Sequence, residues 1–385
     1  MPVYGIQRWG YWRGLLLSLL SLALLLAAAA PATASPVRAQ VEAWISRLEQ
    51  EIVTWQQQPQ TPITGIGAGP MLKLNASGER VRRLAQRLRE LGYLAAEHQS
   101  EVFGTSIEAA VRAFQESQQL KPDGRVGDRT RFALELTPAI AIESLRQTVE
   151  ALRSFAAQAP DRGVLVNLPS QTATLIRQGQ VVFTMRVVVG RPSRETPLLH
   201  DSITHIIVNP TWTVPPTVLR NDKLPLLRKT GSPGIDAADV YLDGEWVLPE
   251  TVDWNTVSPG RVRIVQSPGD HNALGRFRFN LTNDQNIYLH GTNDPKVFSR
   301  DTRAVSSGCV RLEDARRMAE ELLMDNGLTA IRLDPLLITG RPQWIKLNRP
   351  MPVRFVYWLA TLEEDGSVRI HPDIYNVADE TGAPI

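Results

Sequence analysis

The segments Asn286-Ile287-Tyr288-Leu289-His290-Gly291-Thr292 and Ala304-Val305-Ser306-Ser307-Gly308-Cys309-Val310-Arg311 organise the second half of this chain. In the first, apolar Ile287 and Leu289 alternate with Tyr288 and His290, which predicts a half-buried strand that ends at His290. The second immediately precedes apolar residues at helical spacing, so a helix is expected directly after Cys309, ending at Asp325-Asn326-Gly327. The apolar positions of that helix are Leu312, Ala315, Met318, Ala319, Leu322 and Leu323.

Cys309 is the only cysteine among 385 residues. At a helix N-terminus its thiol would face free backbone N–H groups and the positive end of the helix dipole, which predicts a lowered pKa and an exposed thiolate. The same N–H groups could hold the oxyanion of an acyl-transfer intermediate. His290, on a separate element, is the candidate base. The alternative is a buried structural cysteine near an unrelated histidine.

The N-terminus has the pattern of an export signal. Arg8 and Arg13 precede an apolar run over residues 15–30, and Ala32-Thr33-Ala34 offers a small-residue cleavage site, so residues 1–34 are expected to be a signal peptide. The alternative is an uncleaved membrane anchor, because the apolar run is close to the minimum length for a spanning helix. A solitary cysteine in an exported chain is either an intermolecular bridge or a reactive thiol.

The composition describes a globular chain with room for two or three domains. Hydrophobic residues make up 43% of the sequence and charged residues 21%, with a formal net charge of +2, which gives no case for nucleic-acid binding. Amphipathic helices at residues 37–58 and 139–157 cannot bury their apolar faces alone, so we expect them to pair as a scaffold. The corresponding segments are 35–70, which includes a linker, and 139–162.

Residues 71–138 form a separate unit between these helices. Three helices are expected, with a capping box at Thr105-Ser106-Ile107-Glu108 and a third helix beginning near Asp128. The elements Leu-Gly-Tyr-Leu, Ala-Val-Arg-Ala-Phe-Gln and Pro-Asp-Gly-Arg-Val-Gly-Asp resemble, in this order, the peptidoglycan-binding three-helix domain. The resemblance implies binding of wall polymer, and the alternative is that the unit is only a spacer.

From Gly163 onward the pattern is that of β-structure. Strands are expected over residues 164–169, 173–177, 181–189 and 203–208, with a hairpin turn at Gln178-Gly179. The proline-rich run at residues 209–216 predicts a rigid loop that presents Trp212. Residues 221–262 are interpreted as an insertion and a candidate lid.

Several motifs in this region occur in the order found in one known family. They are Gly190-Arg191 with Thr196-Pro197, Asn209-Pro210-x-Trp212, Asn272-Ala273-Leu274-Gly275, Tyr288-Leu289-His290 and Ser306-Ser307-Gly308-Cys309-Val310-Arg311. Together they resemble the YkuD-type L,D-transpeptidase catalytic domain over residues 163–335, in its long Gram-negative branch. Residues 336–385 form a C-terminal extension that fits this branch. The implied fold class is multidomain α+β: a mainly-β catalytic domain, a small all-α three-helix domain and a helical scaffold.

The resemblance implies a role for each matching residue. Cys309 would be the nucleophile, His290 the general base, and the N–H groups of Gly308 and Cys309 the oxyanion hole. Arg311 would pair with a stem-peptide carboxylate, the alternative being an ion pair with Glu313 or Asp314. Tyr288 and Trp212 would line the cleft, the alternative being ordinary packing. Ser307 stands where the family commonly has His, so either a backbone carbonyl near Gly291 or Ser307 would orient His290.

The implied reaction is the formation of 3→3 cross-links in peptidoglycan through a thioester on Cys309. The partners would be peptidoglycan stem peptides, with a tetrapeptide donor and a diaminopimelate acceptor, and other cell-wall enzymes are candidate partners. No cofactor or metal is implied, the expected location is the periplasm, and the family's sensitivity to carbapenems implies acylation of Cys309. Two alternatives stay open: hydrolysis of the same bond by an L,D-carboxypeptidase or endopeptidase, and a catalytically silent wall-binding protein.

Overall fold

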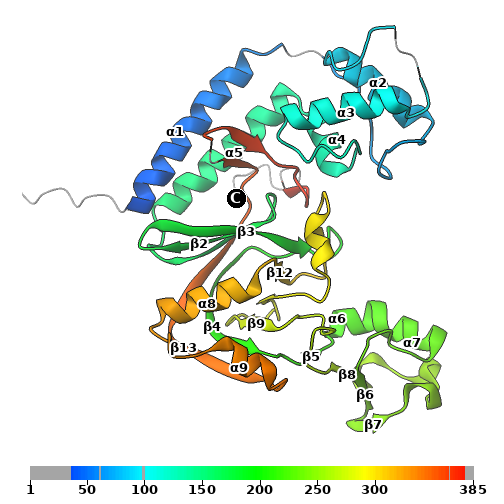
Figure 1. The fold of residues 1–385 in the computed structure, drawn as a ribbon, viewed down its shortest axis with the longest axis vertical. Helices are drawn as coiled ribbons and strands as arrows, with labels where there is room; N and C mark the ends of the chain where they lie inside the picture. The colour runs from blue at the N-terminus through cyan, green and yellow to red at the C-terminus, as the bar shows by residue number, and fades with distance from the viewer. Residues whose placement is uncertain (1–35, 60–61, 98–99, 364, 378–385) are drawn as a thin grey trace, which may run out of the picture. The chain divides into compact units, whose positions relative to one another are not determined.

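The computed structural model describes residues 36–59, 62–97, 100–363 and 365–377. The expected signal peptide at residues 1–34 lies outside these ranges. The described residues form a mixed α+β chain in which helical elements come first and a mainly-β domain follows, which confirms the expected fold class (Figure 1). Among the described residues, no helix combines the length and apolar character needed to cross a membrane.

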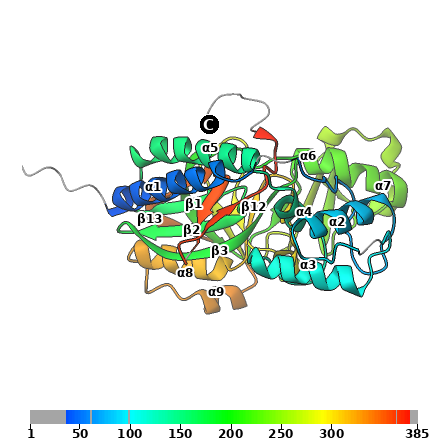
Figure 2. The same cartoon turned by 90° about the horizontal axis from the view of Figure 1, so that it is seen from above.

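The two long amphipathic helices pack against each other, as expected. They are α1 (Pro36–Gln56) and α5 (Pro138–Ala156), and their shared core includes Leu48 and Leu152 (Figures 1 and 2). Trp358 completes this core, with its ring 5.3 Å from that of Trp44. The same cluster includes Ile176 of the main sheet, so the helix pair covers one face of that sheet.

Three shorter helices form a unit with its own apolar core. They are α2 (Glu79–Glu90), α3 (Thr105–Ser117) and α4 (Asp128–Glu135). The third begins where the sequence predicts it. The predicted capping box is wrong: Gly104 is the N-cap of α3, no side chain caps the helix, and Glu108 instead accepts a hydrogen bond from Arg112 at 2.6 Å.

The main sheet has nine strands in the order β11-β3-β12-β10-β9-β4-β13-β1-β2, and a further pairing of β2 with β3 closes it on itself. Closure leaves few unpaired strand edges. Gln178 and Gly179 both have positive φ and form the predicted hairpin turn between β2 and β3. The strands are β1 (Gly163–Asn167), β2 (Thr172–Arg177), β3 (Gln180–Gly190), β4 (Leu199–Val208), β9 (Phe277–Asn280), β10 (Leu289–His290), β11 (Ala304–Ser306), β12 (Val310–Leu312) and β13 (Gln343–Val356).

β13 comes from the segment expected to be a C-terminal extension. It pairs with β1 in parallel and with β4 in antiparallel orientation, so it lies within the sheet. The short strands β14 (Ala360–Leu362) and β15 (Val368–Ile370) follow it and pair with each other. Much of the segment after residue 335 is therefore an integral part of the β-structure.

A second, four-stranded sheet occupies residues 212–266, a wider span than the expected insertion at 221–262. Its core includes Leu227 and Trp254. The prediction that the proline-rich run lacks regular structure is wrong at Trp212 and Thr213, because these residues pair with β8. The elements are β5 (Trp212–Thr213), β6 (Ala238–Leu242), β7 (Glu245–Val247), β8 (Val262–Gln266), α6 (Pro216–Val218), the π-helical turn η1 (Leu219–Lys223) and α7 (Leu224–Thr230).

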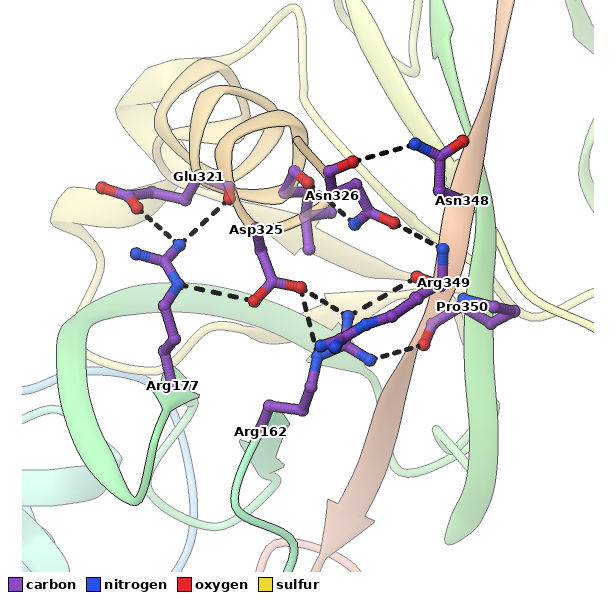
Figure 3. Close-up of polar contacts among 9 residues, drawn as sticks. Arg162, Arg177, Glu321, Asp325, Asn326, Asn348, Arg349 and Pro350 are labelled. Atoms are coloured by element: carbon purple, nitrogen blue, oxygen red, sulfur yellow. Dashed lines mark hydrogen bonds and ion pairs between the residues drawn. The ribbon is translucent and has the colours of Figure 1, made fainter. Parts of the chain in front are cut away.

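Helix α8 (Ala315–Asp325) packs its apolar face on the main sheet, and α9 (Leu333–Ile338) follows it. Gly327, with φ 67°, ends α8 where the sequence predicts. Two arginines anchor this end (Figure 3): the Asp325 carboxylate accepts a hydrogen bond from Arg162 Nε at 3.1 Å and lies 3.6 Å from Arg177 Nε. Asn326 Oδ1 also accepts the N–H of Arg349 at 2.7 Å, which ties the helix to β13.

Candidate active site

Strand register gathers the functional candidates on one face of the main sheet. β10 pairs with β12 so that His290 lies opposite Arg311, and with β9 so that His290 lies opposite Arg278. Because side chains alternate along a strand, Cys309 and Arg311 share a face, whereas Val310 and Leu312 face the apolar core. The predicted strand ending at His290 is therefore confirmed, although it has only two residues.

Cys309 does not lie at a helix N-terminus, so this expectation is wrong. It follows β11 and directly precedes β12, and α8 begins only at Ala315 with Asp314 as its N-cap. The apolar spacing of Leu312 suggested a longer helix, but Leu312 is a strand residue whose side chain joins the same core. The helix dipole therefore cannot activate the thiol.

The pKa of Cys309 is raised, which contradicts the prediction of a lowered value. Desolvation is the largest cause, although Cys309 keeps part of its surface exposed, and it is opposed by hydrogen bonds from Tyr288 and by the charges of Arg278 and Arg311. The thiol lies 3.5 Å from the Asn286 carbonyl oxygen, to which it donates. In this structure the favoured state of Cys309 at neutral pH is the protonated thiol.

His290 is also held in its neutral form. It is buried, and burial together with the positive charge of Arg311 lowers its pKa to about 3. The backbone at Gly291 and Leu274 acts in the opposite direction. Among the described residues, His290 Nδ1 has no hydrogen-bond partner. A neutral imidazole can accept a proton, which is what a base requires.

The turn that carries Cys309 is fixed by Ser306. The buried Ser306 hydroxyl donates to the Cys309 carbonyl at 2.7 Å and accepts the Gly308 N–H at 3.1 Å. Because that N–H is already occupied, the Cys309 N–H is the better candidate for an oxyanion donor. Gly308 has φ 117°, a conformation that favours glycine, and a Cβ there would lie 3.3 Å from Ile287.

The Ser307 side chain contacts an arginine outside the cysteine loop. It is exposed, and its hydroxyl accepts a hydrogen bond from Arg194 Nη1 at 3.1 Å. Arg194 also pairs with Asp222 of the π-helical turn η1, at 2.6 Å. Ser307 therefore links the cysteine loop to the 212–266 segment and has no contact here that would orient His290.

Two arginines on this face have unpaired nitrogen atoms. In the described part of the chain, the buried Nε atoms of Arg278 and Arg311 have no hydrogen-bond partner. Glu313, considered as a partner of Arg311, instead binds Arg186. Arg278 was not identified from the sequence; its guanidinium lies 4.2 Å from the centre of the Tyr288 ring. The only available signal was its position in the strand after Asn272-Ala273-Leu274-Gly275.

Of the two aromatic candidates, Tyr288 interacts with Cys309, and Trp212 interacts with Tyr288. Tyr288 is buried, and its pKa is raised by burial and by Cys309, with Trp212 and Arg278 acting in the opposite direction. Trp212 reaches this group from β5 and is half-buried. Neither His205, which packs against Trp344, nor His271, which contacts Ser267, joins the site. No cluster that could hold a metal occurs among the residues described.

Two segments of the chain match known protein families. Residues 161–342 match the family model described as the YkuD L,D-transpeptidase catalytic domain, and residues 77–134 match one described as "Putative peptidoglycan binding domain". A Haemophilus influenzae protein named "Putative L,D-transpeptidase" is 34% identical over 218 residues. That alignment covers 55% of this chain and 44% of the relative, so this chain matches less than half of the relative's length.

Solved structures titled as L,D-transpeptidases are also similar. One from Stackebrandtia nassauensis is 14% identical, with 77% of this chain and 97% of that chain covered and a TM-score of 0.24. One from Mycobacterium smegmatis is 13% identical, with 51% and 58% covered and a TM-score of 0.27. These TM-scores are too low to carry an argument about either chain.

Proposed function

Because the chain contains a YkuD-type L,D-transpeptidase catalytic domain and an N-terminal peptidoglycan-binding domain, we propose that it is a cysteine-dependent enzyme that forms 3→3 cross-links in peptidoglycan. The observation that carries the proposal is the strand register that sets Cys309, His290 and Arg311 on one face of the sheet. A nucleophile, a base and a cation for a carboxylate are what acyl transfer between stem peptides requires.

In the first half-reaction, Cys309 Sγ attacks the carbonyl carbon of the third residue of a tetrapeptide stem, a diaminopimelate. His290 takes the thiol proton and delivers it to the leaving amine as the bond to the terminal D-Ala breaks. In the second half-reaction, the side-chain amine of another stem's diaminopimelate attacks the thioester. Its proton passes to His290, and the sulfur leaves and recovers a proton. No cofactor takes part in these steps.

The raised pKa of Cys309 and the lowered pKa of His290 favour proton transfer during attack over a preformed ion pair. Arg311 both lowers the pKa of His290 and has an unpaired Nε. A substrate carboxylate bound to Arg311 would screen that charge and raise the basicity of His290. The base therefore gains strength when substrate is bound.

The pH dependence of alkylation tests this resting state. Iodoacetamide reacts with the thiolate, so a raised pKa moves the rise in alkylation rate to higher pH than for an ordinary cysteine, whose pKa is about 8.5. At pH 7 the free protein should react more slowly than free cysteine. A midpoint below the ordinary value would instead support a preformed thiolate–imidazolium pair.

Product mass spectrometry tests the reaction itself. Incubation with tetrapeptide muropeptides should yield cross-linked dimers with loss of D-Ala, and Cys309→Ala should yield none. Tripeptides without dimers would identify a hydrolase, and unchanged substrate with a folded wild-type protein would favour a silent wall-binding protein. We also propose export to the periplasm, where this substrate is found; detection of the protein only in the cytoplasmic fraction would contradict it.

A further inference from the structure

Tyr375 lies outside the matched catalytic family region but reaches the cysteine loop through buried hydrogen bonds. Its hydroxyl donates to the Gly190 carbonyl at 2.7 Å and accepts the Thr196 N–H at 3.2 Å. The matched region ends at residue 342. The tyrosine is 6% exposed and belongs to the main core of the domain.

Thr196 carries the connection to the loop. Its hydroxyl accepts the Gly190 N–H at 2.8 Å and donates to the Gly308 carbonyl at 2.7 Å. Thr196 is 2% exposed, so water does not compete freely for these bonds. At Gly190 the turn approaches closely enough that a Cβ would lie 2.6 Å from the Thr196 nitrogen, which only glycine avoids.

The Gly308 carbonyl and the Cys309 N–H belong to one planar peptide group and point in opposite directions. The bond from Thr196 therefore sets the direction of the Cys309 N–H. The Gly308 N–H is already bound to Ser306, so the peptide groups on both sides of Gly308 are fixed. The hydrogen bond that Thr196 donates to the Gly308 carbonyl therefore orients the Cys309 N–H, which lies on the opposite side of the same peptide group.

The other end of this connection is anchored in the C-terminal segment itself. The Tyr375 N–H donates to the Tyr357 hydroxyl at 2.9 Å, and that hydroxyl donates to Asp373. The Asp373 carboxylate also accepts the Val377 N–H at 3.1 Å. The position of Tyr375 is thus fixed by hydrogen bonds from backbone N–H groups to the Tyr357 and Asp373 side chains, none of which involves the cysteine loop.

We propose that Tyr375 is a positioning residue that, through Thr196, orients the Cys309 N–H toward the oxyanion of the acylation step. This inference rests on the proposed acyl transfer and assigns part of the site to the segment after residue 342. Tyr375 acts through Thr196 and touches no reacting atom.

Two reagents separate this role from simple structural support. A carbapenem acylates the thiol through a tetrahedral oxyanion, whereas iodoacetamide alkylates it without one. Tyr375→Phe and Thr196→Val should lower the maximal rate of carbapenem acylation by roughly 10- to 100-fold, while the alkylation rate changes less than about 2-fold. The apparent affinity for the carbapenem should stay the same. Thr196→Ser, which keeps the hydroxyl, should restore most of the acylation rate.

Thr174→Val is the matched control. It removes a hydroxyl that bonds to Thr184 between β2 and β3, and it should leave both reactions unchanged. Equal loss of acylation and alkylation in Tyr375→Phe, or loss of neither, would overturn the proposal. A loss that Thr196→Ser does not restore would count against the hydroxyl connection.

Hydrogen exchange gives an answer that does not depend on activity. Peptides covering residues 304–312 should exchange faster in Tyr375→Phe than in the wild type, and the Thr174→Val control should match the wild type. Unchanged exchange in Tyr375→Phe would overturn the positioning role. If carbapenem does not acylate the wild type, but residues 304–312 still exchange faster in Tyr375→Phe than in the wild type, the proposed transpeptidase function fails. The structural connection then stands.

Discussion

Two groups of arginines within residues 161–342 differ in the groups that neutralise their charge. At the end of α8, Arg162 and Arg177 meet the carboxylates of Asp325 and Glu321, and the neighbouring backbone is also paired (Figure 3). On the face that carries Cys309, neither Arg278 nor Arg311 forms an ion pair with a carboxylate of the described residues. Their buried Nε atoms have no hydrogen-bond partner there; Arg177 Nε also has none, but it lies 3.6 Å from the Asp325 carboxylate.

We infer that the first group stabilises the fold and that the second binds a ligand. A buried charge is costly unless it is paired, so an arrangement that pairs every cation stabilises the fold. Arginines that keep unsatisfied donors have a cost that a ligand carboxylate can offset. The α8 cluster therefore anchors a helix, and the cysteine face is suited to bind an anionic group.

The largest expected effect is a loss of stability when the ion pairs of Asp325 with Arg162 and Arg177 are broken. Asp325→Asn leaves two arginines without their shared carboxylate and should lower the free energy of unfolding by about 3 kcal/mol. This is the lower end of the usual range, because Arg162 and Arg177 keep 20% and 23% of their side-chain surface exposed. Urea denaturation measures the change, and activity per folded molecule should be retained.

The control for this variant is on the same helix. Glu320→Gln removes an exposed pair with Arg316 and should change the free energy of unfolding by less than about 1 kcal/mol. Equal destabilisation by the two substitutions would show that the buried cluster has no special role.

The second-largest expected effect is a loss of catalytic efficiency when Arg278 or Arg311 is replaced. Arg278→Met and Arg311→Met should each lower kcat/KM for a tetrapeptide donor by roughly 10- to 100-fold, since a hydrogen bond to a charged group contributes about 1.5–3 kcal/mol. Their free energy of unfolding should fall by less than in Asp325→Asn, because no ion pair is broken. Arg278→Met does remove the hydrogen bond from Arg278 Nη2 to Asn280 Oδ1 at 2.8 Å. Destabilisation as large as that of Asp325→Asn would erase the distinction between the two groups.

The smallest expected effect is at Ser307. Ser307→Ala removes an exposed hydroxyl that contacts Arg194 and should change kcat by less than about 3-fold. Steady-state kinetics with the same donor measure it, and His290→Ala provides the contrast, because loss of the base should cost roughly 100-fold or more. A large loss in Ser307→Ala with an altered pH profile would return Ser307 to the catalytic group.

The sequence alone predicted correctly those features that depend on residues close together in the chain. The α8 face, its end at Gly327, the hairpin turn at Gln178-Gly179 and the strand end at His290 all follow from side-chain periodicity and from backbone conformations that few residues tolerate. The ordered motifs also predicted both family matches, at residues 161–342 and 77–134. Cys309 and His290 were candidates from their residue types alone.

Tertiary structure decided the environment of those residues. Periodicity could not show that Leu312 belongs to a strand, because a short apolar run fits either element. It also could not show that Arg278 and Arg311 both flank His290, or that Tyr375 supports Gly308 through Thr196. These neighbours are far apart in the chain, and only strand register and burial bring them together. The sequence determined which reactive groups are present; packing determined their protonation, their partners and their orientation.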